Sequence, residues 1–452
     1  MKKIALFIVV FTLISSSVLR AQNELKDISL EDIWVTYKFF PKSIRGINSL
    51  QNGEQYTMIK NGNLVVYDYE AGDSVTTMIK TDELIVDGKE EPIQLRSFSM
   101  NKDETKFLIP TETESIYRHS SKSVNYLWDS QNKTLEPLST GKQQLAEYSP
   151  DGKKVAFVRD NNLFIKNLVS NEEVAITDDG AFNHIINGTC DWVYEEEFGF
   201  TKAFHWSPDG KKIAFYKFDE SRVKEYTLTY YGELYPNLYT YKYPKAGEDN
   251  SFVNIYVYQV DKKETVKMDI GEETDQYIPR IKWTNDANIL GIQRLNRLQN
   301  HLDILLANAF TGESRILYSE DNPYYIDITD NLTFVGDNDW FIITSERDGY
   351  NHIYLYDMEG NILRQLTSGN WDVTEVYGYD PENKRIYFQS AEESPLNRDI
   401  YHVDLKGKRT KISKRSGTNS AAFSDNFEYY INTFSDVHTP PYITVNNAKG
   451  KE

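Results

Sequence analysis

A turn-and-strand unit that recurs along the chain constrains the fold more than any other feature of the sequence. Residues 149–157 read SPDGKKVAF and residues 207–215 read SPDGKKIAF, so the two stretches differ at one position of nine. In each copy a Pro-Asp-Gly turn leads into a strand-like run of apolar residues. A match of this length is improbable by chance and indicates an internal repeat.

Weaker copies of the unit begin near six further residues: Ser49, Ser99, Lys282, Val335, Tyr379 and Phe423. The chain thus contains eight units, most of them spaced by roughly 44 to 58 residues. Four-stranded propeller blades repeat about every 40 to 50 residues. The pattern predicts an all-β fold, an eight-bladed β-propeller over residues 45–445. A two-sheet sandwich is the alternative, but it would not repeat one signature eight times.

The gap between the copies at Ser207 and Lys282 is longer than the other gaps. It holds Tyr-rich sequence, including residues 226–231 (YTLTYY) and 241–247 (YKYPKAG). Such an insertion runs over the surface of a blade and projects from it. We therefore expect an extended arm at about residues 225–250.

The start of the chain has the pattern of a secretory signal peptide. Lys2 and Lys3 precede an apolar stretch at residues 4–13, and small residues follow before Gln22. Residues 1–21 are therefore predicted to be a signal peptide, and the mature protein to be exported to the periplasm or the extracellular space. No later apolar run is long enough to span a bilayer.

Composition and motifs exclude several classes of function. The formal net charge of −18 makes a nucleic acid an improbable partner. The chain has no Gly-x-Ser-x-Gly elbow, no His-Glu-x-x-His motif and no phosphate-binding glycine loop, and its seven histidines are dispersed. The single Cys190 permits no internal disulfide and has no neighbouring base to activate it. We predict no catalytic residue, no metal ligand and no cofactor in this chain.

One cluster could bind a ligand. Residues 191–198 read DWVYEEEF, three consecutive carboxylates among aromatic side chains that can hold the segment against the protein. A short helical turn here, breaking the strand pattern, would let two glutamates converge on one cation. The ammonium of a free peptide N-terminus is such a cation. The alternatives are an exposed acidic turn or a salt bridge to a neighbouring blade.

Arg118, within residues 117–120 (YRHS), is a second candidate for ligand binding. A guanidinium can donate hydrogen bonds to a peptide carbonyl or orient a carboxylate. The alternative is an arginine that only covers the edge of a blade.

Residues 191–197 resemble the double-glutamate motif of dipeptidyl peptidase IV, in the prolyl oligopeptidase family. Residues 114–120, 243–247, 349–354 and 366–371 agree, and the resemblance, closest to Bacteroidetes-type members, covers nearly the whole mature chain. It implies a propeller that caps an α/β-hydrolase domain and helps to release N-terminal Xaa-Pro or Xaa-Ala dipeptides. It also implies that Glu196 and Glu197 hold the substrate ammonium and that Arg118 contacts a substrate carbonyl.

The same resemblance assigns the remaining segments. Residues 22–44 would pack on the hydrolase domain, the arm at 225–250 would serve homodimerisation, and the polar residues 446–452 would form a linker towards that domain. The sequence stops at Glu452, before the point where the family continues into its hydrolase domain with Ser, Asp and His. This chain is therefore expected to bind peptides rather than cleave them unaided.

Two other functions stay open at this point. One is a free-standing, non-catalytic propeller that binds peptides or a protein partner. The other is a purely structural role, in which Glu196 and Glu197 affect no binding property.

Overall fold

The computed structural model describes residues 27–41 and 43–452, which divide into two units, one that ends at Ser43 and one of residues 44–452. The described part of the first unit contains helix α2 (Leu30–Trp34), where the Ser29 side chain accepts a hydrogen bond from the Asp32 backbone N–H. The predicted signal peptide lies outside the described residues. Among the described helices, none has the length and apolar character required to cross a bilayer.

The second unit consists of eight small antiparallel sheets and a separate two-stranded hairpin. Blade 1 contains β1 (Asn48–Ser49), β2 (Gln55–Lys60), β3 (Asn63–Asp68) and β4 (Ser74–Ile79), and blade 2 contains β5 (Ser99–Met100), β6 (Lys106–Ser115), β7 (Ser121–Asp129) and β8 (Thr134–Pro137). Blade 3 contains β9 (Gln144–Tyr148), β10 (Lys154–Arg159), β11 (Asn162–Asn167) and β12 (Glu173–Ala175). Blade 4 contains β13 (Ile185–Asn187), β14 (Phe204–Trp206), β15 (Lys212–Asp219), β18 (Phe252–Gln259) and β19 (Glu264–Lys267). Blade 5 contains β20 (Gln276–Trp283), β21 (Ile289–Asn296), β22 (His301–Asn308) and β23 (Ser314–Asp321), and blade 6 contains β24 (Thr333–Val335), β25 (Trp340–Ser345), β26 (His352–Asp357) and β27 (Ile362–Gln365). Blade 7 contains β28 (Val373–Asp380), β29 (Arg385–Ser390), β30 (Asp399–Asp404) and β31 (Arg409–Lys411). Blade 8 contains β32 (Thr418–Phe423), β33 (Tyr429–Ser435) and β34 (Tyr442–Asn447). A 3₁₀ turn, η1 (Thr81–Glu83), follows the first blade.

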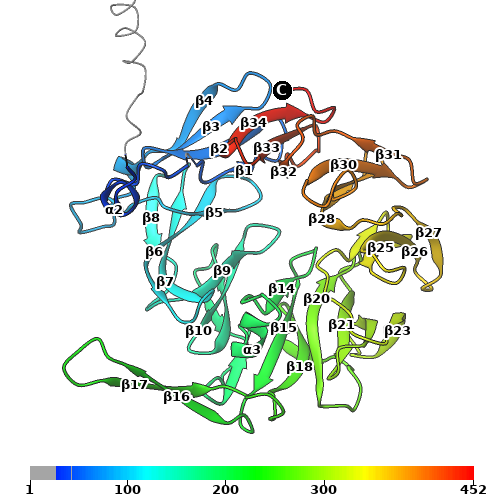
Figure 1. The fold of residues 1–452 in the computed structure, drawn as a ribbon. Coiled ribbons are helices and arrows are strands. Elements are labelled where there is room, and N and C mark those ends of the chain that lie inside the picture. Colours follow the sequence, from blue (N-terminus) through cyan, green and yellow to red (C-terminus); the bar gives the residue numbers. More distant parts are fainter. Residues whose placement is uncertain (1–26, 42) are drawn as a thin grey trace, which may run out of the picture. The chain divides into compact units, whose positions relative to one another are not determined.

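The sheets stand around a ring, and the predicted eight-bladed β-propeller is confirmed (Figure 1). Each copy of the sequence repeat lies at the turn that connects the first strand of a blade's β-meander to the second. The turn at residues 149–153, for example, joins β9 to β10, and the turn at 207–211 joins β14 to β15. The repeat predicts the fold because it encodes the same turn in every blade.

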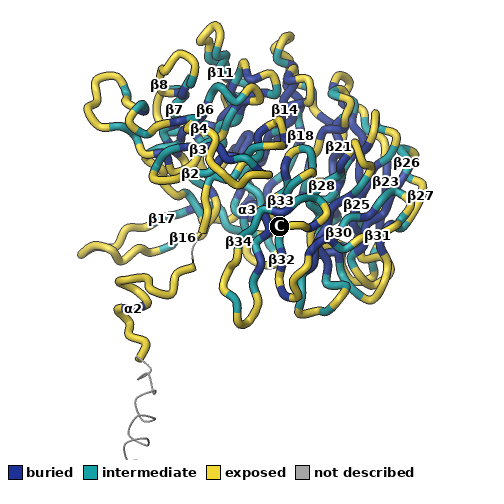
Figure 2. Tube along the Cα trace, turned by 90° about the horizontal axis from the view of Figure 1, so that it is seen from above, coloured by how far each residue is buried: buried dark blue, intermediate teal, exposed yellow. Residues whose placement is uncertain are grey.

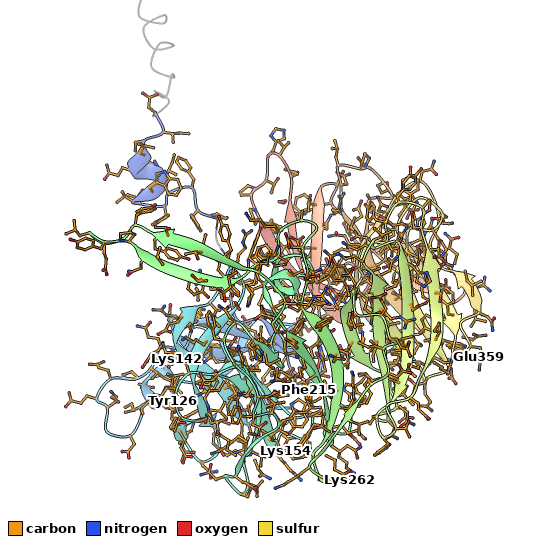
Figure 3. The ribbon with its side chains drawn as sticks, turned by 90° about the horizontal axis from the view of Figure 1, so that it is seen from below. Tyr126, Lys142, Lys154, Phe215, Lys262 and Glu359 are labelled. Carbon is orange, nitrogen blue, oxygen red and sulfur yellow. The ribbon has the colours of Figure 1, made fainter. Side chains whose placement is uncertain are left out.

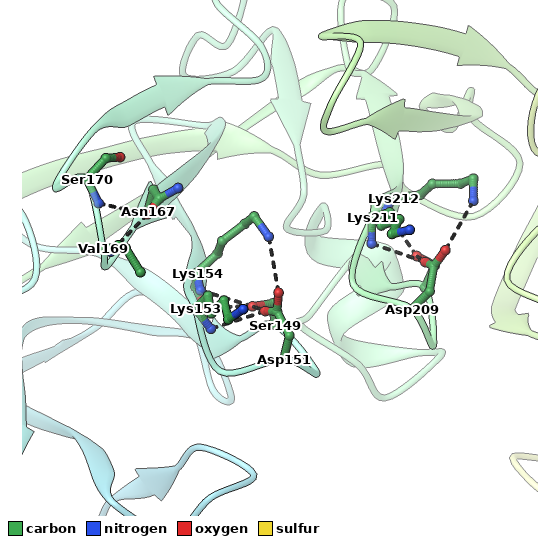
Figure 4. Close-up of polar contacts among 11 residues, drawn as sticks. Ser149, Asp151, Lys153, Lys154, Asn167, Val169, Ser170, Asp209, Lys211 and Lys212 are labelled. Carbon is green, nitrogen blue, oxygen red and sulfur yellow. Dashed lines mark hydrogen bonds and ion pairs between the residues drawn. The ribbon is translucent and has the colours of Figure 1, made fainter.

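Side-chain hydrogen bonds explain why the strongest copies share their residues (Figure 4). The Ser149 hydroxyl donates to Asp151 at 2.6 Å and accepts from the Lys154 backbone N–H at 3.0 Å. The Asp151 carboxylate also accepts from the Lys153 N–H at 3.1 Å. These bonds satisfy turn amides that no strand can pair, which fixes the chain reversal locally.

Eight hydrophobic clusters fill the seams between consecutive blades. Strand β10 shows why: Val155 and Phe157 pack towards blade 2, whereas Ala156 and Val158 pack towards blade 4. Because alternate strand residues face opposite sides, a sheet that is apolar on both faces must be covered on both. The buried residues accordingly lie within the blades, and the exposed ones at the connecting loops (Figure 2).

The side chains follow the same division (Figure 3). Phe215 of β15 lies inside the stacked sheets and is 2% exposed. Lys262 and Glu359, in turns between outer strands, are exposed at the ends of their blades. The propeller core is therefore distributed over eight seams and has no single centre.

The seam between blades 8 and 1 closes the ring through side chains. Tyr69 stacks on Tyr429 with ring centroids 5.4 Å apart and an angle of 4° between the planes. The Asp425 backbone N–H donates to the Ser49 hydroxyl at 3.0 Å. Within residues 44–452, no strand of blade 8 pairs with a strand of blade 1. Side-chain packing and this hydrogen bond, without strand pairing, therefore join the two blades.

We expect Gly53→Ala to destabilise this closing seam. Gly53 has a φ of +66°, and a Cβ there would lie 2.2 Å from the Asn426 side chain of blade 8. Backbone strain of about 1–2 kcal/mol and the displacement of Asn426 should together lower the free energy of unfolding by about 2 kcal/mol or more. Urea unfolding followed by circular dichroism measures the change.

Gly72→Ala is the matched control for this prediction. Gly72 has a φ of +69°, and a Cβ at that residue would meet nothing within 4 Å. The Gly72→Ala variant should therefore lose only the part of the free energy of unfolding that comes from backbone strain. Equal destabilisation by the two substitutions would contradict the proposed contact at the seam.

The long insertion forms the hairpin of β16 (Glu225–Tyr230) and β17 (Asn237–Lys242), which projects from blade 4 (Figures 1 and 2). Its tip exposes large apolar side chains, namely Tyr230, Tyr231, Leu234, Tyr235 and Leu238. At its base Tyr241 is buried against Tyr117 of blade 2, with ring centroids 5.8 Å apart. The hairpin is thus anchored to the loop that carries Arg118.

Candidate functional site

The acidic motif forms helix α3 (Trp192–Glu196), which interrupts blade 4 between β13 and β14, as the sequence predicts. The Asp191 side chain caps the helix by accepting a hydrogen bond from the Tyr194 N–H at 3.0 Å. It accepts a second, at 2.6 Å, from the Ser251 hydroxyl at the start of β18. Burial raises the pKa of the Asp191 carboxyl. The cap therefore ties the start of α3 to the sheet.

Tyr194 fixes the helix to the seam between blades 4 and 5. Its side chain is 2% exposed, and its phenol oxygen accepts a hydrogen bond from the Ile278 backbone N–H of β20 at 3.0 Å. Its ring lies 4.8 Å from the ring of Phe198 and 4.9 Å from that of Phe218. These contacts place the glutamates that follow it.

Glu195 joins the helix to blade 2. It is 1% exposed, and its Oε1 accepts hydrogen bonds from the backbone N–H groups of His119 at 2.7 Å and Ser120 at 2.9 Å. Both donors lie in the loop between β6 and β7 that also carries Arg118. Hydrogen bonds to a charged acceptor contribute about 1.5–3 kcal/mol each, so Glu195 holds the Arg118 loop beside α3.

Arg118 and Glu196 meet at this junction. The Arg118 Nε lies 3.5 Å from the Glu196 Oε2, and the two side chains are 74% and 15% exposed. An ion pair with so exposed a partner contributes little, about 0–1 kcal/mol, so the arginine is free to bind another group. The structure thus contains the predicted candidates Arg118 and Glu196 side by side, and also the salt bridge between blades that was the alternative.

Glu197 directly follows, at the C-terminal end of α3. Its backbone N–H donates to the Val193 carbonyl at 2.8 Å, and the residue is exposed. A carboxylate and a guanidinium from blades 4 and 2 therefore border one patch of surface, and Glu197 is the next residue along the chain. Such a patch can bind a group that carries both a cation and a hydrogen-bond acceptor.

The role of Glu195 was not found from the sequence. The three glutamates are identical in type, and only the burial of the first one distinguishes it. Cys190 is buried with its thiol 2.9 Å from the Phe200 carbonyl, and burial raises its pKa, as expected of a packed side chain. Within residues 27–41 and 43–452, no group of three or more His, Cys, Asp or Glu side chains could hold a metal ion.

Comparisons with known proteins decide the family. The model of the dipeptidyl peptidase IV (DPP IV) N-terminal region matches residues 101–441, a span that contains Arg118, Glu196 and Glu197. The chain belongs to the DPP IV N-terminal region family. The fold of this DPP IV-type propeller is similar to that in the crystal structure of Porphyromonas gingivalis dipeptidyl peptidase 4, with a TM-score of 0.88 and 41% sequence identity over 94% of this chain and 61% of that one.

Curated relatives of this DPP IV-type chain agree. It is 30% identical over 380 residues to a protein of Aspergillus terreus described as probable dipeptidyl-aminopeptidase B, over 76% of this chain and 41% of the fungal protein. It is 32% identical over 360 residues to a protein of Arthroderma gypseum with the same description, over 72% of this chain and 39% of that protein. The chain therefore spans about two fifths of the length of these relatives.

Proposed function

We propose that the chain is the substrate-gating propeller of a DPP IV-like serine exopeptidase, which releases Xaa-Pro and Xaa-Ala dipeptides from peptide N-termini. Glu196 and Glu197 bind the ammonium group of the peptide, and Arg118 binds a backbone carbonyl. The observation that carries the proposal is the buried Glu195, which holds the Arg118 loop against α3 and so keeps Arg118 beside Glu196.

The geometry suits recognition of a peptide N-terminus. A terminal ammonium has three donors and is largely protonated at neutral pH, so it can bond to two carboxylates together. A carbonyl of the same peptide can accept from the exposed guanidinium of Arg118. With the N-terminus fixed, a serine nucleophile placed two residues away would cut off a dipeptide.

Cleavage needs a partner domain. A serine nucleophile and its base would come from an α/β-hydrolase domain, on which residues 22–44 are expected to pack and towards which residues 446–452 would lead. In the same proposal the protein is exported to the periplasm or the extracellular space. The exposed apolar tip of the β16–β17 hairpin supports a role for the arm in a homodimer.

The first test is capture of a free N-terminus by the purified chain. A Gly-Pro peptide with a free amine should bind, and its N-acetylated form should bind more weakly. Glu197→Gln should weaken binding of the free peptide by about 1.5–3 kcal/mol, roughly tenfold to 150-fold, because a charged hydrogen bond is lost. Isothermal titration calorimetry measures both.

Glu272→Gln is the control, because Glu272 is also exposed but lies in the loop before β20. It should leave peptide affinity unchanged. Equal affinities of the wild-type protein and the Glu197→Gln variant would contradict the assigned role and favour a purely structural acidic turn.

A second test separates the exopeptidase from a propeller that only binds. Hydrolysis of a Gly-Pro chromogenic amide is measured with the chain alone and with a separately expressed hydrolase domain of a close relative. Activity only with the added domain supports the proposal. No activity in a complex shown to form would favour a non-catalytic module for peptides or a protein partner.

A further inference from the structure

A cavity of about 600 Å³ lies next to the loop that Glu195 holds. Its walls come from the loop between β6 and β7, the end of blade 3, helix α3 and the β16–β17 hairpin. Glu195 and Ser120 belong to the wall, whereas Arg118, Glu196 and Glu197 do not line it. The cavity is therefore a separate space that shares one wall with the candidate site.

Glu220, directly after β15, is a buried carboxyl group in this cavity. The residue is 6% exposed, and its backbone N–H donates to the His184 carbonyl at 2.8 Å. Its carboxyl oxygens make no hydrogen bond or ion pair with any of the described residues, and they keep slight exposure to solvent. A buried carboxyl group without a partner costs stability, which makes it a candidate for binding a ligand.

The other buried carboxyl groups of the cavity are already bonded. Asp191 accepts from Ser251 and caps α3, and Glu195 accepts from two backbone amides. The basic side chains of the wall are paired as well. Arg159 bonds to Glu173, and Lys142 bonds to Glu114. Glu220 is thus the buried ionisable group of the wall that is left to meet a ligand.

Aromatic rings make up much of the remaining wall. The aromatic residues that line the cavity are Tyr117, Phe182, Trp192, Tyr230 and Tyr239. Burial raises the pKa of Tyr117, and Tyr239 and Glu220 add to this, which places the three groups near one another. Aromatic faces attract organic cations, and a carboxylate beside them supplies a counter-ion. The combination recognises an amine or a guanidinium.

The pKa of Glu220 provides a way to detect the binding of such a cation. The pKa of Glu220 is raised to about 8, mainly by burial and to a smaller extent by Asp191 and Asp219, with Lys242 opposing them. Tyr117 and Cys190 also face the carboxyl group. Near pH 7 Glu220 is therefore mostly protonated, and a cation that binds to its ionised form must displace that proton.

We propose that this cavity binds a primary alkylammonium or guanidinium group, with Glu220 as its counter-ion and the aromatic residues as its walls. The ligand is a free amine or the side chain of a lysine or arginine, which present the same group. The site is distinct from the one proposed for the peptide N-terminus and does not depend on it.

The test is calorimetric titration of the purified chain with n-butylammonium chloride, in buffers of different ionisation enthalpy. At pH 7 binding should release close to one proton per site, and n-butanol, the neutral analogue, should release none. Glu220→Gln should abolish the proton release and weaken the binding at least tenfold. Asp160→Asn, which removes an exposed carboxylate of the same cavity, should change neither.

Three further measurements make the test more specific. Between pH 6 and pH 9 the affinity of the unmutated chain should rise at least tenfold, because Glu220 ionises over this range while the amine stays charged. Glu197→Gln should leave the proton release unchanged, which separates this site from the proposed peptide site. N-acetyl-lysinamide, whose side chain ends in the same ammonium group, should bind like n-butylammonium if the cavity admits a peptide side chain, and should bind more weakly if the cavity admits only a small free amine.

Either of two results would overturn the proposal. One is binding of n-butylammonium by the Glu220→Gln variant with unchanged affinity. The other is binding to the unmutated chain without proton release and without any dependence on pH.

Discussion

Tyr194→Ala should lower the free energy of unfolding by about 4 kcal/mol, because it empties the seam between blades 4 and 5. Tyr194 packs against Phe198 and Phe218 with centroid distances of 4.8 and 4.9 Å, and almost none of its surface is exposed. The substitution also leaves the buried Ile278 N–H without its acceptor, which costs about 1–3 kcal/mol within that total. Urea unfolding at pH 7 measures the loss.

Tyr194→Phe divides this effect into its parts. It keeps the ring and removes only the phenol oxygen that accepts from Ile278, so it should cost about 1–2 kcal/mol. The same variant should bind peptides nearly as the unmutated chain does, since α3 keeps its packing. A loss from Tyr194→Phe as large as that from Tyr194→Ala would show that packing of the ring contributes little.

Glu220→Gln is expected to stabilise the protein increasingly as pH rises. The carboxyl group of the unfolded chain ionises at the usual glutamate pKa of 4.5, whereas burial raises the pKa of the folded one to about 8. Between these values the folded state binds more protons than the unfolded state, so the stability of the unmutated chain falls as pH rises. Glutamine is neutral throughout and does not show this loss.

The gain should be near zero at pH 4 and about 2–4 kcal/mol at pH 9, given about 1.4 kcal/mol per pH unit of displaced titration. Urea unfolding of both proteins at pH 4, 7 and 9 measures it. Glu272→Gln, at an exposed residue, should show no such trend. A constant difference between Glu220→Gln and the unmutated chain across this range would show that Glu220 ionises normally in the folded protein.

Local turn chemistry made the propeller predictable from the sequence. Ser149 and Asp151 bond within their own turn, so the same short sequence recurs at the corresponding turn of blade 4, and weaker copies mark the other six blades. The helical break at residues 192–196 was predictable for the same reason, because Asp191 caps it across three residues.

The contacts that shape the candidate site join residues far apart in the sequence. Glu195 bonds to amides at His119 and Ser120, more than seventy residues away, and no periodicity predicts such a contact. The resemblance to a family placed Arg118 beside Glu196, which residue types alone did not. Glu220 follows Asp219 in a polar stretch that is typical of a surface turn, and only the packing around the hairpin base buries it.

The seam of Tyr69 and Tyr429 has a mechanical consequence. At every other seam the polypeptide itself runs from one blade to the next, so blades that part remain tethered at high effective concentration. Blades 8 and 1 have no such tether and share no β-ladder, so separating them breaks the contacts of one hydrophobic cluster and the hydrogen bond from Asp425 to Ser49 but no strand pairing. The ring should therefore open first at the seam between blades 8 and 1. A circular permutation that covalently joins blade 8 to blade 1 would move this first opening to the seam where the new chain ends lie.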